Sequence, residues 1–240
     1  MNTINPLLFY TNRNCPYAQR SWLTLLELQV DFDDHEIELG LDNKTDWFLT
    51  LNPNGTVPVI KHGETVVYES LVVNEYLCEV FGDNGITLIP NEPAARSRVR
   101  ILMNRCDSKF VKLSYSYLSH KPTAEVDSMT KDDQLRTHLE SELRFLDNAI
   151  SSAGGPYFMG KTVSLVDIAY IPFFERISVA LAHWKDFDMT RLRIEHLNTW
   201  FEVMSNREST QKTSLTSERI LELYSRFLNL DYFKRVGIAQ

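Results

Sequence analysis

Residues 14–20 read NCPYAQR and follow a short apolar run at residues 6–10. The apolar run is typical of a strand, and the periodic residues 22–28 that come next predict a helix. Cys15 therefore stands at a helix N-terminus, where unpaired backbone N–H groups and the positive end of the helix dipole favour a thiolate. Pro16 suits the first helical position, because the N–H group that proline lacks would have no helical partner there. We expect Cys15 to have a lowered pKa and to act as a nucleophile near neutral pH.

A buried cysteine that only precedes a helix is the alternative for Cys15, since free cysteine often serves as a small hydrophobic residue. Arg13 and Arg20 place two cations near the thiol in the sequence, and Asn14 and Pro16 suit a solvent-facing turn. These neighbours favour a reactive thiol over a core residue.

The composition excludes two classes of partner. The chain has 240 residues and a formal net charge of −7, without any long block of Lys and Arg. Because phosphate binding needs a basic face, nucleic acid is not expected as a main partner. No apolar run approaches the roughly 20 residues that a helix needs to cross a bilayer. We also find no signal-peptide pattern and expect no membrane partner.

Cysteine usage points to a reducing compartment. The three cysteines, Cys15, Cys78 and Cys106, are widely spaced and odd in number, which is typical of free thiols rather than of a disulfide framework. We therefore expect a cytoplasmic location, and no metal-ligand set is expected. Cys78 and Cys106 fall within predicted helices, where an inert core role is the better interpretation.

The first 82 residues alternate strands and helices. Strands are expected at residues 7–10, 30–39, 57–60 and 65–68, and helices at 15–28, 43–51 and 70–81. The last two strands flank a tight His62-Gly63 turn and predict a hairpin. Ser70 is expected to cap the helix that follows. The order βαβαββα predicts a small α/β domain over residues 1–82.

Pro58 lies inside a strand-like run, where proline normally indicates an edge strand. A cis bond between Val57 and Pro58 would instead turn the chain and leave the backbone of Val57 facing a ligand. The residues alone favour the edge strand, since only about one X–Pro bond in twenty is cis.

Residues 83–92 have the composition of a linker, and residues 93–240 are helical in pattern. Ser164 and Asp167 form a Ser-x-x-Asp cap before a segment that is apolar nearly all round, which predicts a buried central helix. The other helices are expected at residues 93–118, 131–152, 193–204 and 217–233. The second domain is therefore predicted to be all-α.

This combination resembles the cytosolic glutathione transferase superfamily, whose first domain has the thioredoxin fold. The start of the first helix, CPYAQR, is similar to the cysteine-type members: the omega class first, with the lambda and dehydroascorbate reductase classes close. Further motifs match in the family's order, over residues 7 to about 170: NKTDWF at 43–48, NPNGTVPV at 52–59, YES at 68–70 and SLVD at 164–167.

The resemblance implies a glutathione site in the first domain. In this family the bond before the proline at the position of Pro58 is cis, and the backbone of the preceding residue, here Val57, pairs with the cysteinyl part of glutathione. Ser70 would bind the γ-glutamyl carboxylate at the helix start, and Glu69 would accept from the ammonium. Both residues could instead serve only as a helix cap. Tyr17 and Lys44 complete the implied set, Lys44 for the glycyl carboxylate.

Cys15 sets the reaction that the resemblance implies. Conjugating classes use Ser or Tyr to stabilise the glutathione thiolate, whereas a cysteine would form a mixed disulfide with glutathione. Ala18 stands where a Cys-x-x-Cys pair has its second thiol, so a second glutathione would release the adduct. The expected function is a thiol transferase and reductase with glutathione as co-substrate. It would act in deglutathionylation or in dehydroascorbate-type reduction.

The second substrate would be a small electrophile or a glutathionylated molecule. Arg100, Met103 and Tyr115 are candidates for the walls of its pocket, although core packing is the commoner role of such residues on a helix.

Two alternatives keep the same fold. A conjugating transferase would use glutathione itself as nucleophile, and a non-catalytic relative would bind glutathione as an interaction protein. A membrane-inserting version is disfavoured, because Asp31, Asp33 and Asp34 follow the first helix and burying carboxylates in lipid is costly. A homodimer is implied by the resemblance alone.

Overall fold

The computed structural model describes residues 7–82 and 85–239. Asp83 and Asn84, at the start of the predicted linker, lie outside the described residues. Among the residues described, no helix combines the length and the apolar character that crossing a membrane requires.

The chain divides into two compact units. The first unit extends to Arg96 and also includes Arg207–Thr213, and the second contains Ser97–Asn206 and the chain from Ser214 onward. The domain boundaries expected at residues 82 and 93 stay a prediction.

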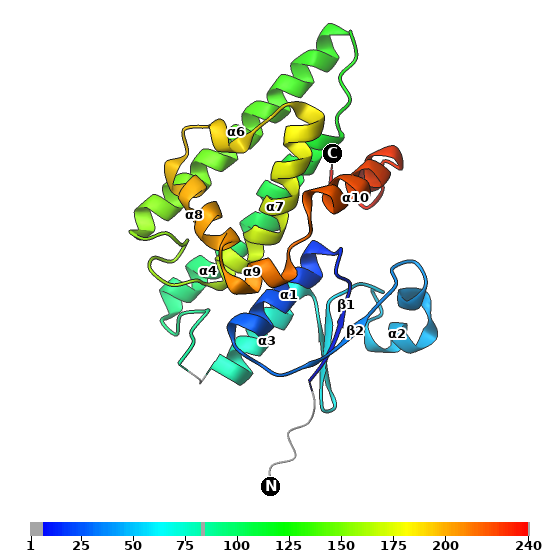
Figure 1. Ribbon diagram of the computed structural model, residues 1–240, viewed down its shortest axis with the longest axis vertical. Coiled ribbons are helices and arrows are strands. Elements are labelled where there is room, and N and C mark those ends of the chain that lie inside the picture. The colour runs from blue at the N-terminus through cyan, green and yellow to red at the C-terminus, as the bar shows by residue number, and fades with distance from the viewer. Residues whose placement is uncertain (1–6, 83–84, 240) are drawn as a thin grey trace. The chain divides into compact units, whose positions relative to one another are not determined.

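The first unit is a sheet with helices on both faces. In chain order its main elements are β1 (Leu7–Thr11), α1 (Pro16–Glu27), β2 (Asp33–Glu36), α2 (Asp46–Leu51), β3 (Val59–His62), β4 (Thr65–Tyr68) and α3 (Ser70–Phe81). The strand order is β2-β1-β3-β4, with β1 parallel to β2 and antiparallel to β3. In Figure 1, α1 and α3 lie side by side against the strands, and α2 lies on the opposite side. The predicted βαβαββα order and thioredoxin-like architecture are confirmed.

Strand β2 is shorter than predicted. The pattern at residues 30–39 predicts a long strand, but only Asp33–Glu36 pair with β1, and all four of these side chains are exposed. The apolar residues that gave the pattern lie outside the strand: Phe32 packs edge-on against Phe9, and Ile37 is buried. The apolar residues of the pattern therefore flank a short, exposed edge strand, and they do not form one face of a long half-buried strand.

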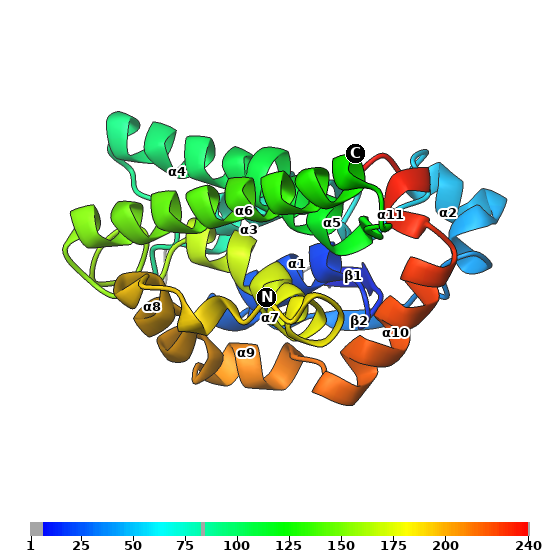
Figure 2. The ribbon, with the colours of Figure 1, turned by 90° about the horizontal axis from the view of Figure 1, so that it is seen from above.

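From α4 onward the described chain is helical, as predicted. Its main helices are α4 (Pro93–Arg105), the π-helical segment η3 (Cys106–Val111), α5 (Lys112–Ser119), α6 (Val126–Ala153), α7 (Leu165–Lys185), α8 (Glu195–Ser205), α9 (Glu208–Thr213), α10 (Ser217–Asn229) and α11 (Tyr232–Arg235). Within the second unit, α7 packs against α5, α8 and α10, as Figure 2 shows.

The start of α7 confirms the predicted cap. The Ser164 hydroxyl accepts from the backbone N–H of Val166, and the Ser164 backbone N–H donates to Asp167 Oδ2 at 2.8 Å. Asp167 is fully buried and also accepts from the Trp200 indole N–H at 2.8 Å. The fully buried carboxylate thus joins the helix start to α8, and α7 is the buried central helix that its composition predicts.

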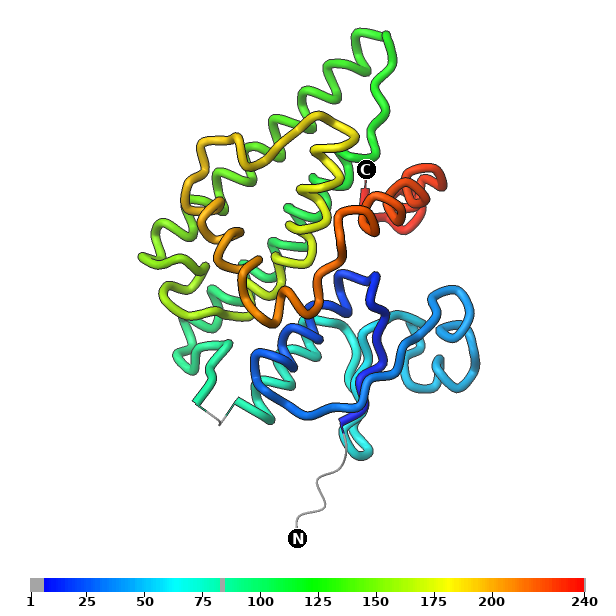
Figure 3. The backbone as a smooth tube through the Cα atoms, viewed as in Figure 1, coloured from blue at the N-terminus to red at the C-terminus, as the bar shows by residue number. Residues whose placement is uncertain are grey.

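The helices differ from the prediction in several places, and α6 begins at Val126, five residues before the predicted start at 131. The single helix expected over residues 93–118 is interrupted by η3. The helix expected over 217–233 breaks before Asp231, which has φ of +48°. The short helix α9 is not predicted at all; the tube in Figure 3 shows it between α8 and α10 along the chain.

Candidate functional site

The turn between β1 and α1 positions the Cys15 thiol. Cys15 is the N-cap of α1, with φ of −83° and ψ of 120°, and Pro16 is the first helical residue, as expected. Asn12 holds this turn: its side-chain amide donates to the Ile37 carbonyl at 2.9 Å, and its Oδ1 accepts from the Asn14 N–H at 3.1 Å. The Cys15 N–H bonds to the Asn12 carbonyl at 2.9 Å. Asn12 therefore fixes where the thiol lies.

The half-buried Cys15 lies beside the backbone of Val57. The distance from its Sγ to the Val57 carbonyl oxygen is 4.0 Å. The Val57–Pro58 peptide bond is cis, as the family resemblance implied and the residues alone did not. The thiol and the backbone of the cis-proline segment thus lie next to each other in the first unit.

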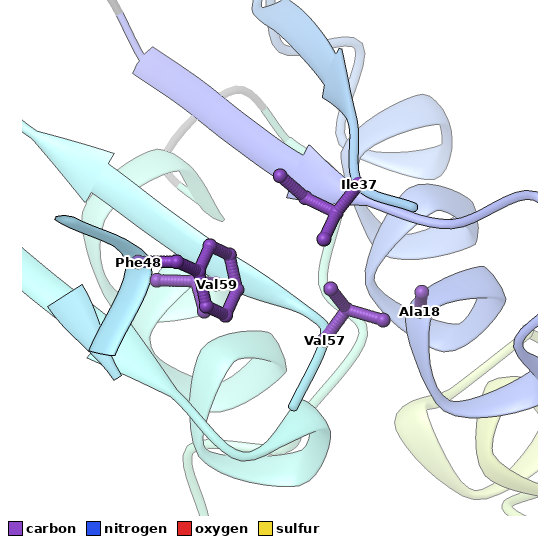
Figure 4. Close-up of a cluster of buried hydrophobic side chains, with 5 residues drawn as sticks. All are labelled: Ala18, Ile37, Phe48, Val57 and Val59. Carbon is purple, nitrogen blue, oxygen red and sulfur yellow. The ribbon is translucent and has the colours of Figure 1, made fainter. Parts of the chain in front are cut away.

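A small apolar cluster supports both sides of this meeting point. It consists of Ala18, Ile37, Phe48, Val57 and Val59, and Figure 4 shows the side chain of Val57 between those of Ile37 and Ala18. Cys15 and Tyr10 pack against the same cluster. Close-packed interiors hold side chains in defined rotamers. The cluster therefore limits how far the backbone segments at Cys15 and at Val57 can shift relative to each other.

The two arginines near the thiol in sequence are used differently. Arg13 donates to Asp34 Oδ2 of the exposed strand β2 at 2.8 Å, and its guanidinium lies over the Trp22 ring of α1. Arg20 is fully buried and donates from Nη1 to the Ser70 hydroxyl oxygen at 3.4 Å. Arg20 also lies over the ring of the half-buried Tyr17, 5.2 Å from its centroid. The structure thus connects Tyr17 and Ser70 through one buried cation.

Ser70 does not cap α3, and that part of the prediction is wrong. Glu69 is the N-cap, with φ of +69°, and among the described residues no side chain caps this helix start. The positive φ of Glu69 turns the chain from β4 into the helix, so that Ser70 is already helical. Ser70 is buried, with its hydroxyl oxygen accepting from Arg20.

Glu69 is exposed, and a residue missed by the sequence reasoning orients it. Asn54 donates from its side-chain amide to Glu69 Oε1 at 3.0 Å. Asn54 itself is held by Asn52, whose Oδ1 accepts from the Asn54 N–H at 3.0 Å. The NPNG composition of this segment indicates a turn, and that was the one available signal for Asn54.

Lys44 lies next to the loop that contains Asn54 and Gly55. Asn43 donates to the Gly55 carbonyl at 2.6 Å, which ties the segment before α2 to the loop before Val57. Gly55 has φ of +61°, and a Cβ there would lie 3.6 Å from Lys44 Nζ. The exposed ammonium of Lys44 is therefore next to this loop, within the unit that holds Cys15 and Glu69.

The residues suggested for a second-substrate pocket belong to the second unit. Met103 and Tyr115 are buried, and the Tyr115 hydroxyl bonds to that of Tyr224 at 2.7 Å while its ring stacks on Phe233. Arg100 is exposed on α4. Burial of Met103 and Tyr115 fits the core role that was weighed against the pocket role, and the pocket role stays a prediction.

A groove of about 590 Å³ lies elsewhere in the second unit, at the C-terminal ends of α5, α7 and α10. Its lining includes His120, Lys121, Asp132, Trp184 and Lys185. Lys185 Nζ donates to Asp132 Oδ1 and to the His120 carbonyl, both at 2.6 Å. The lysine therefore satisfies a carbonyl group at the end of α5.

The other two cysteines are buried. Burial raises the pKa of the Cys78 thiol to about 12, with Glu75 and Glu79 adding to the shift. Cys106 is fully buried, and its Sγ lies 3.3 Å from the Ala169 carbonyl oxygen. Both positions fit the inert core role that the sequence suggests.

Both halves of the chain match models of one family. Residues 14–80 match "Glutathione S-transferase, N-terminal domain", and residues 124–202 match "Glutathione S-transferase, C-terminal domain".

Relatives from three classes are similar in sequence. Glutathione S-transferase L1 of Arabidopsis thaliana is 30% identical over 220 residues, which is 91% of this chain and 86% of the relative. Glutathione S-transferase omega-1 of Sus scrofa is 31% identical over 170 residues, or 70% of this chain and 66% of the relative. A probable glutathione S-transferase DHAR2 from Oryza sativa subsp. japonica is 26% identical over 208 residues, or 87% of this chain and 68% of the relative.

Among solved structures, glutathione transferase Omega 3C from Trametes versicolor aligns with a TM-score of 0.78 and 27% identity, covering 94% of this chain and 91% of that one. The shared architecture agrees with the sequence matches over both halves. The chain therefore belongs to the glutathione transferase superfamily, with relatives among its cysteine-type lambda, omega and dehydroascorbate reductase members.

Proposed function

We propose that this chain is a glutathione-dependent thiol transferase and reductase of the omega-like type, in which Cys15 forms a mixed disulfide with glutathione. One observation carries the proposal. The Cys15 thiol is at the N-terminus of α1, half-buried, and its sulfur lies 4.0 Å from the carbonyl oxygen that precedes the cis-proline. A helix N-terminus stabilises a negative charge, so this position favours the nucleophilic thiolate.

Different groups of the first unit would bind the different residues of glutathione. The backbone N–H and C=O of Val57, held by the cis Pro58 bond, would pair with the cysteinyl part. The start of α3 and the Ser70 hydroxyl would bind the γ-glutamyl carboxylate, because a helix N-terminus offers unpaired N–H donors to an anion. Glu69 would accept from the ammonium, in the orientation that Asn54 gives it.

Two further residues would complete the glutathione site. Lys44 would meet the glycyl carboxylate from the loop next to Gly55. Tyr17, held next to Arg20, would border the site near Ser70.

The reaction needs two thiol exchanges and balances without any other reagent. The Cys15 thiolate attacks the glutathione sulfur of a mixed disulfide, and the substrate sulfur leaves as a thiolate that takes up a proton. A free glutathione thiolate then attacks the glutathione sulfur of the Cys15 adduct, which releases oxidised glutathione and restores the Cys15 thiolate. Ala18 stands at the position of a second active-site thiol, and Cys78 and Cys106 are buried, so free glutathione is the resolving reagent.

The proposal includes a cellular setting and an oligomeric state. Free cysteines fit a reducing compartment such as the cytoplasm. A homodimer is proposed from the family alone.

The experiment is mass spectrometry after exposure to oxidised glutathione, combined with turnover of a small glutathione mixed disulfide. We expect one adduct, mapped to Cys15. Cys15→Ser should lose both the adduct and the turnover while keeping glutathione binding, whereas Cys78→Ser, the matched control, should keep all three. If Cys15→Ser instead raised the conjugation of a chlorinated aromatic and wild type showed no thiol exchange, the proposal would be wrong in favour of a conjugating transferase.

A further inference from the structure

An apolar patch is exposed on the first unit, over the segment between β2 and α2 and the first turn of α2. Leu39, Leu41 and Trp47 are 47%, 61% and 49% exposed. Single exposed apolar residues are normal, whereas contiguous exposed apolar surface marks an interaction site. These three side chains lie within one segment of nine residues. Aromatic residues in particular are enriched in protein interfaces.

The patch adjoins a negatively charged edge of the sheet. Strand β2 is the edge strand next to β1, and its side chains are all exposed. The exposed carboxylates of this region are those of Asp31, Asp33, Asp34, Glu36, Glu38 and Asp46. Arg13 pairs with Asp34 and Glu36. Together, the apolar patch and these carboxylates form what we call the docking face.

A row of rings joins the docking face to the cluster beneath the thiol. The exposed His35 stacks on Tyr10, with ring centroids 5.2 Å apart, and Tyr10 lies 6.1 Å from the ring of Trp47. Tyr10 and Cys15 both pack against the cluster that contains Val57. A partner bound at the docking face would therefore be separated by the Tyr10 ring from the apolar cluster against which Cys15 packs.

The charge of the docking face selects its partner. Pairing of this face with the same face of a second copy is disfavoured, because the two acidic edges would repel each other. Charged side chains on an edge strand are a common means of preventing pairing between like edges. A segment that carries Lys or Arg would be attracted, and an extended segment could pair with the edge strand β2 as a further strand.

We propose that the docking face binds an extended, Lys- or Arg-containing segment of a protein substrate, next to a cysteine that carries glutathione. This rests on the proposed function and names its substrate class. The glutathione sulfur of the substrate would be attacked by the Cys15 thiolate, and the protein thiolate would leave and be protonated, as in the two exchanges given above. The electrostatic contact would mainly raise the rate of association.

The test compares two short glutathionylated peptides that differ only in their flanking residues, lysines in one and glutamates in the other, with a small glutathione mixed disulfide as reference. For wild type at low salt we expect kcat/KM for the lysine peptide to exceed that for the glutamate peptide by about tenfold or more. Asp33→Lys and Leu41→Asn should each reduce this preference and leave turnover of the small disulfide unchanged. Asp33 is chosen because Asp34 and Glu36 hold Arg13.

The matched controls make the same changes elsewhere in the first unit. Glu64→Lys places the same charge change in the exposed turn between β3 and β4, and Val72→Asn replaces an apolar side chain of α3 that is 56% exposed. Both should keep the wild-type preference. Equal effects of Asp33→Lys and Glu64→Lys, or equal turnover of the two peptides by wild type, would overturn the proposal.

A binding measurement separates this proposal from the proposed function. If wild type did not turn over even the small disulfide, the proposed function would fail. Binding of the lysine peptide with its cysteine changed to serine, measured by calorimetry at low salt, would then decide on the docking face. Binding that Asp33→Lys weakens and Glu64→Lys does not would support it, and absence of binding would overturn it.

Discussion

Arg207 donates from Nε to Oε1 of Glu27 at 2.8 Å, and so joins two residues that are 180 positions apart in the sequence. Arg207 Nη2 donates to the other carboxylate oxygen, Oε2, which makes the pair bidentate. The Glu27 side chain is only 9% exposed and that of Arg207 29% exposed. Ser209 also bonds to Glu27. A nearly buried carboxylate on α1 thus anchors the segment that contains α9.

We therefore predict that Arg207→Ala destabilises the chain by about 1–3 kcal/mol, because the nearly buried Glu27 carboxylate would lose its bidentate partner. Arg219→Ala is the matched control, since Arg219 pairs with Glu222 on an exposed helix surface. Its effect should stay below about 1 kcal/mol, as for most exposed ion pairs. Urea unfolding measures both. Equal losses in the two variants would contradict the prediction.

The same pair shows what the sequence could not reveal. Helix α9 has the sequence ESTQKT, which carries no apolar period, and its buried residues are Ser209, Thr210 and Thr213. Its partners are polar groups of α1, including Gln19, which donates to the Thr213 hydroxyl at 3.2 Å. Periodicity detects burial of apolar surface, so a helix held by hydrogen bonds and an ion pair gives no signal.

At the candidate site, too, features with a local sequence signal could be predicted, and features that depend on tertiary contacts could not. Cys15, Pro16 and the strand-turn-helix around them could be predicted, because a helix start has local sequence signals. The cis bond before Pro58 came from the family resemblance and not from the residues. Asn12 and Asn54 were missed, because each acts by bonding to residues that the fold brings near it, Ile37 and Glu69.

Cysteine reactivity should separate the three thiols. Cys15 is half-buried, while Cys78 and Cys106 are buried. The pKa of about 12 means that Cys78 stays protonated at neutral pH and is a poor nucleophile. Titration with a disulfide reagent at pH 7 should therefore modify one thiol in the folded chain and three after unfolding. Cys15→Ser should remove the fast reaction and Cys106→Ala should not; fast modification of Cys78 in the folded chain would contradict this assignment.

The backbone conformation of the loop next to Lys44 requires a glycine at position 55. Its φ is +61°, and a Cβ there would lie 2.8 Å from the backbone oxygen of Asn43, which cannot move aside as a side chain can. Gly55→Ala should lower the free energy of unfolding by about 1–3 kcal/mol, the usual cost of a side chain held in a left-handed conformation.

The control for this change is Gly82→Ala. Gly82 has φ of −71°, and a Cβ there would meet open space. Alanine at such a position should be neutral or slightly stabilising. If Lys44 meets the glycyl carboxylate as proposed, Gly55→Ala should also raise the KM for glutathione, and Gly82→Ala should not. An unchanged stability of Gly55→Ala would show that the loop adapts without strain.

Asp132 makes the stability of the second unit depend on acid. Burial acts to raise the pKa of Asp132, but hydrogen bonds from Lys185 and His120 outweigh it and hold the pKa below its usual value. A carboxyl with a lowered folded pKa contributes stability that is fully present above its unfolded pKa of about 3.9 and is lost as the pH falls through the folded value. The Lys185 side chain is only 8% exposed, so its ammonium has little access to water when the carboxylate is removed.

Asp132→Asn should therefore lower the free energy of unfolding at pH 7 by about 1–3 kcal/mol. The difference from wild type should stay constant down to about pH 5 and shrink as the pH falls below about 4, because wild type then loses the same charge. Asp133→Asn, an exposed neighbour on α6, should change stability little at any pH. Urea unfolding at a series of pH values gives both curves, and a difference between Asp132→Asn and wild type that grew on acidification would contradict the assignment.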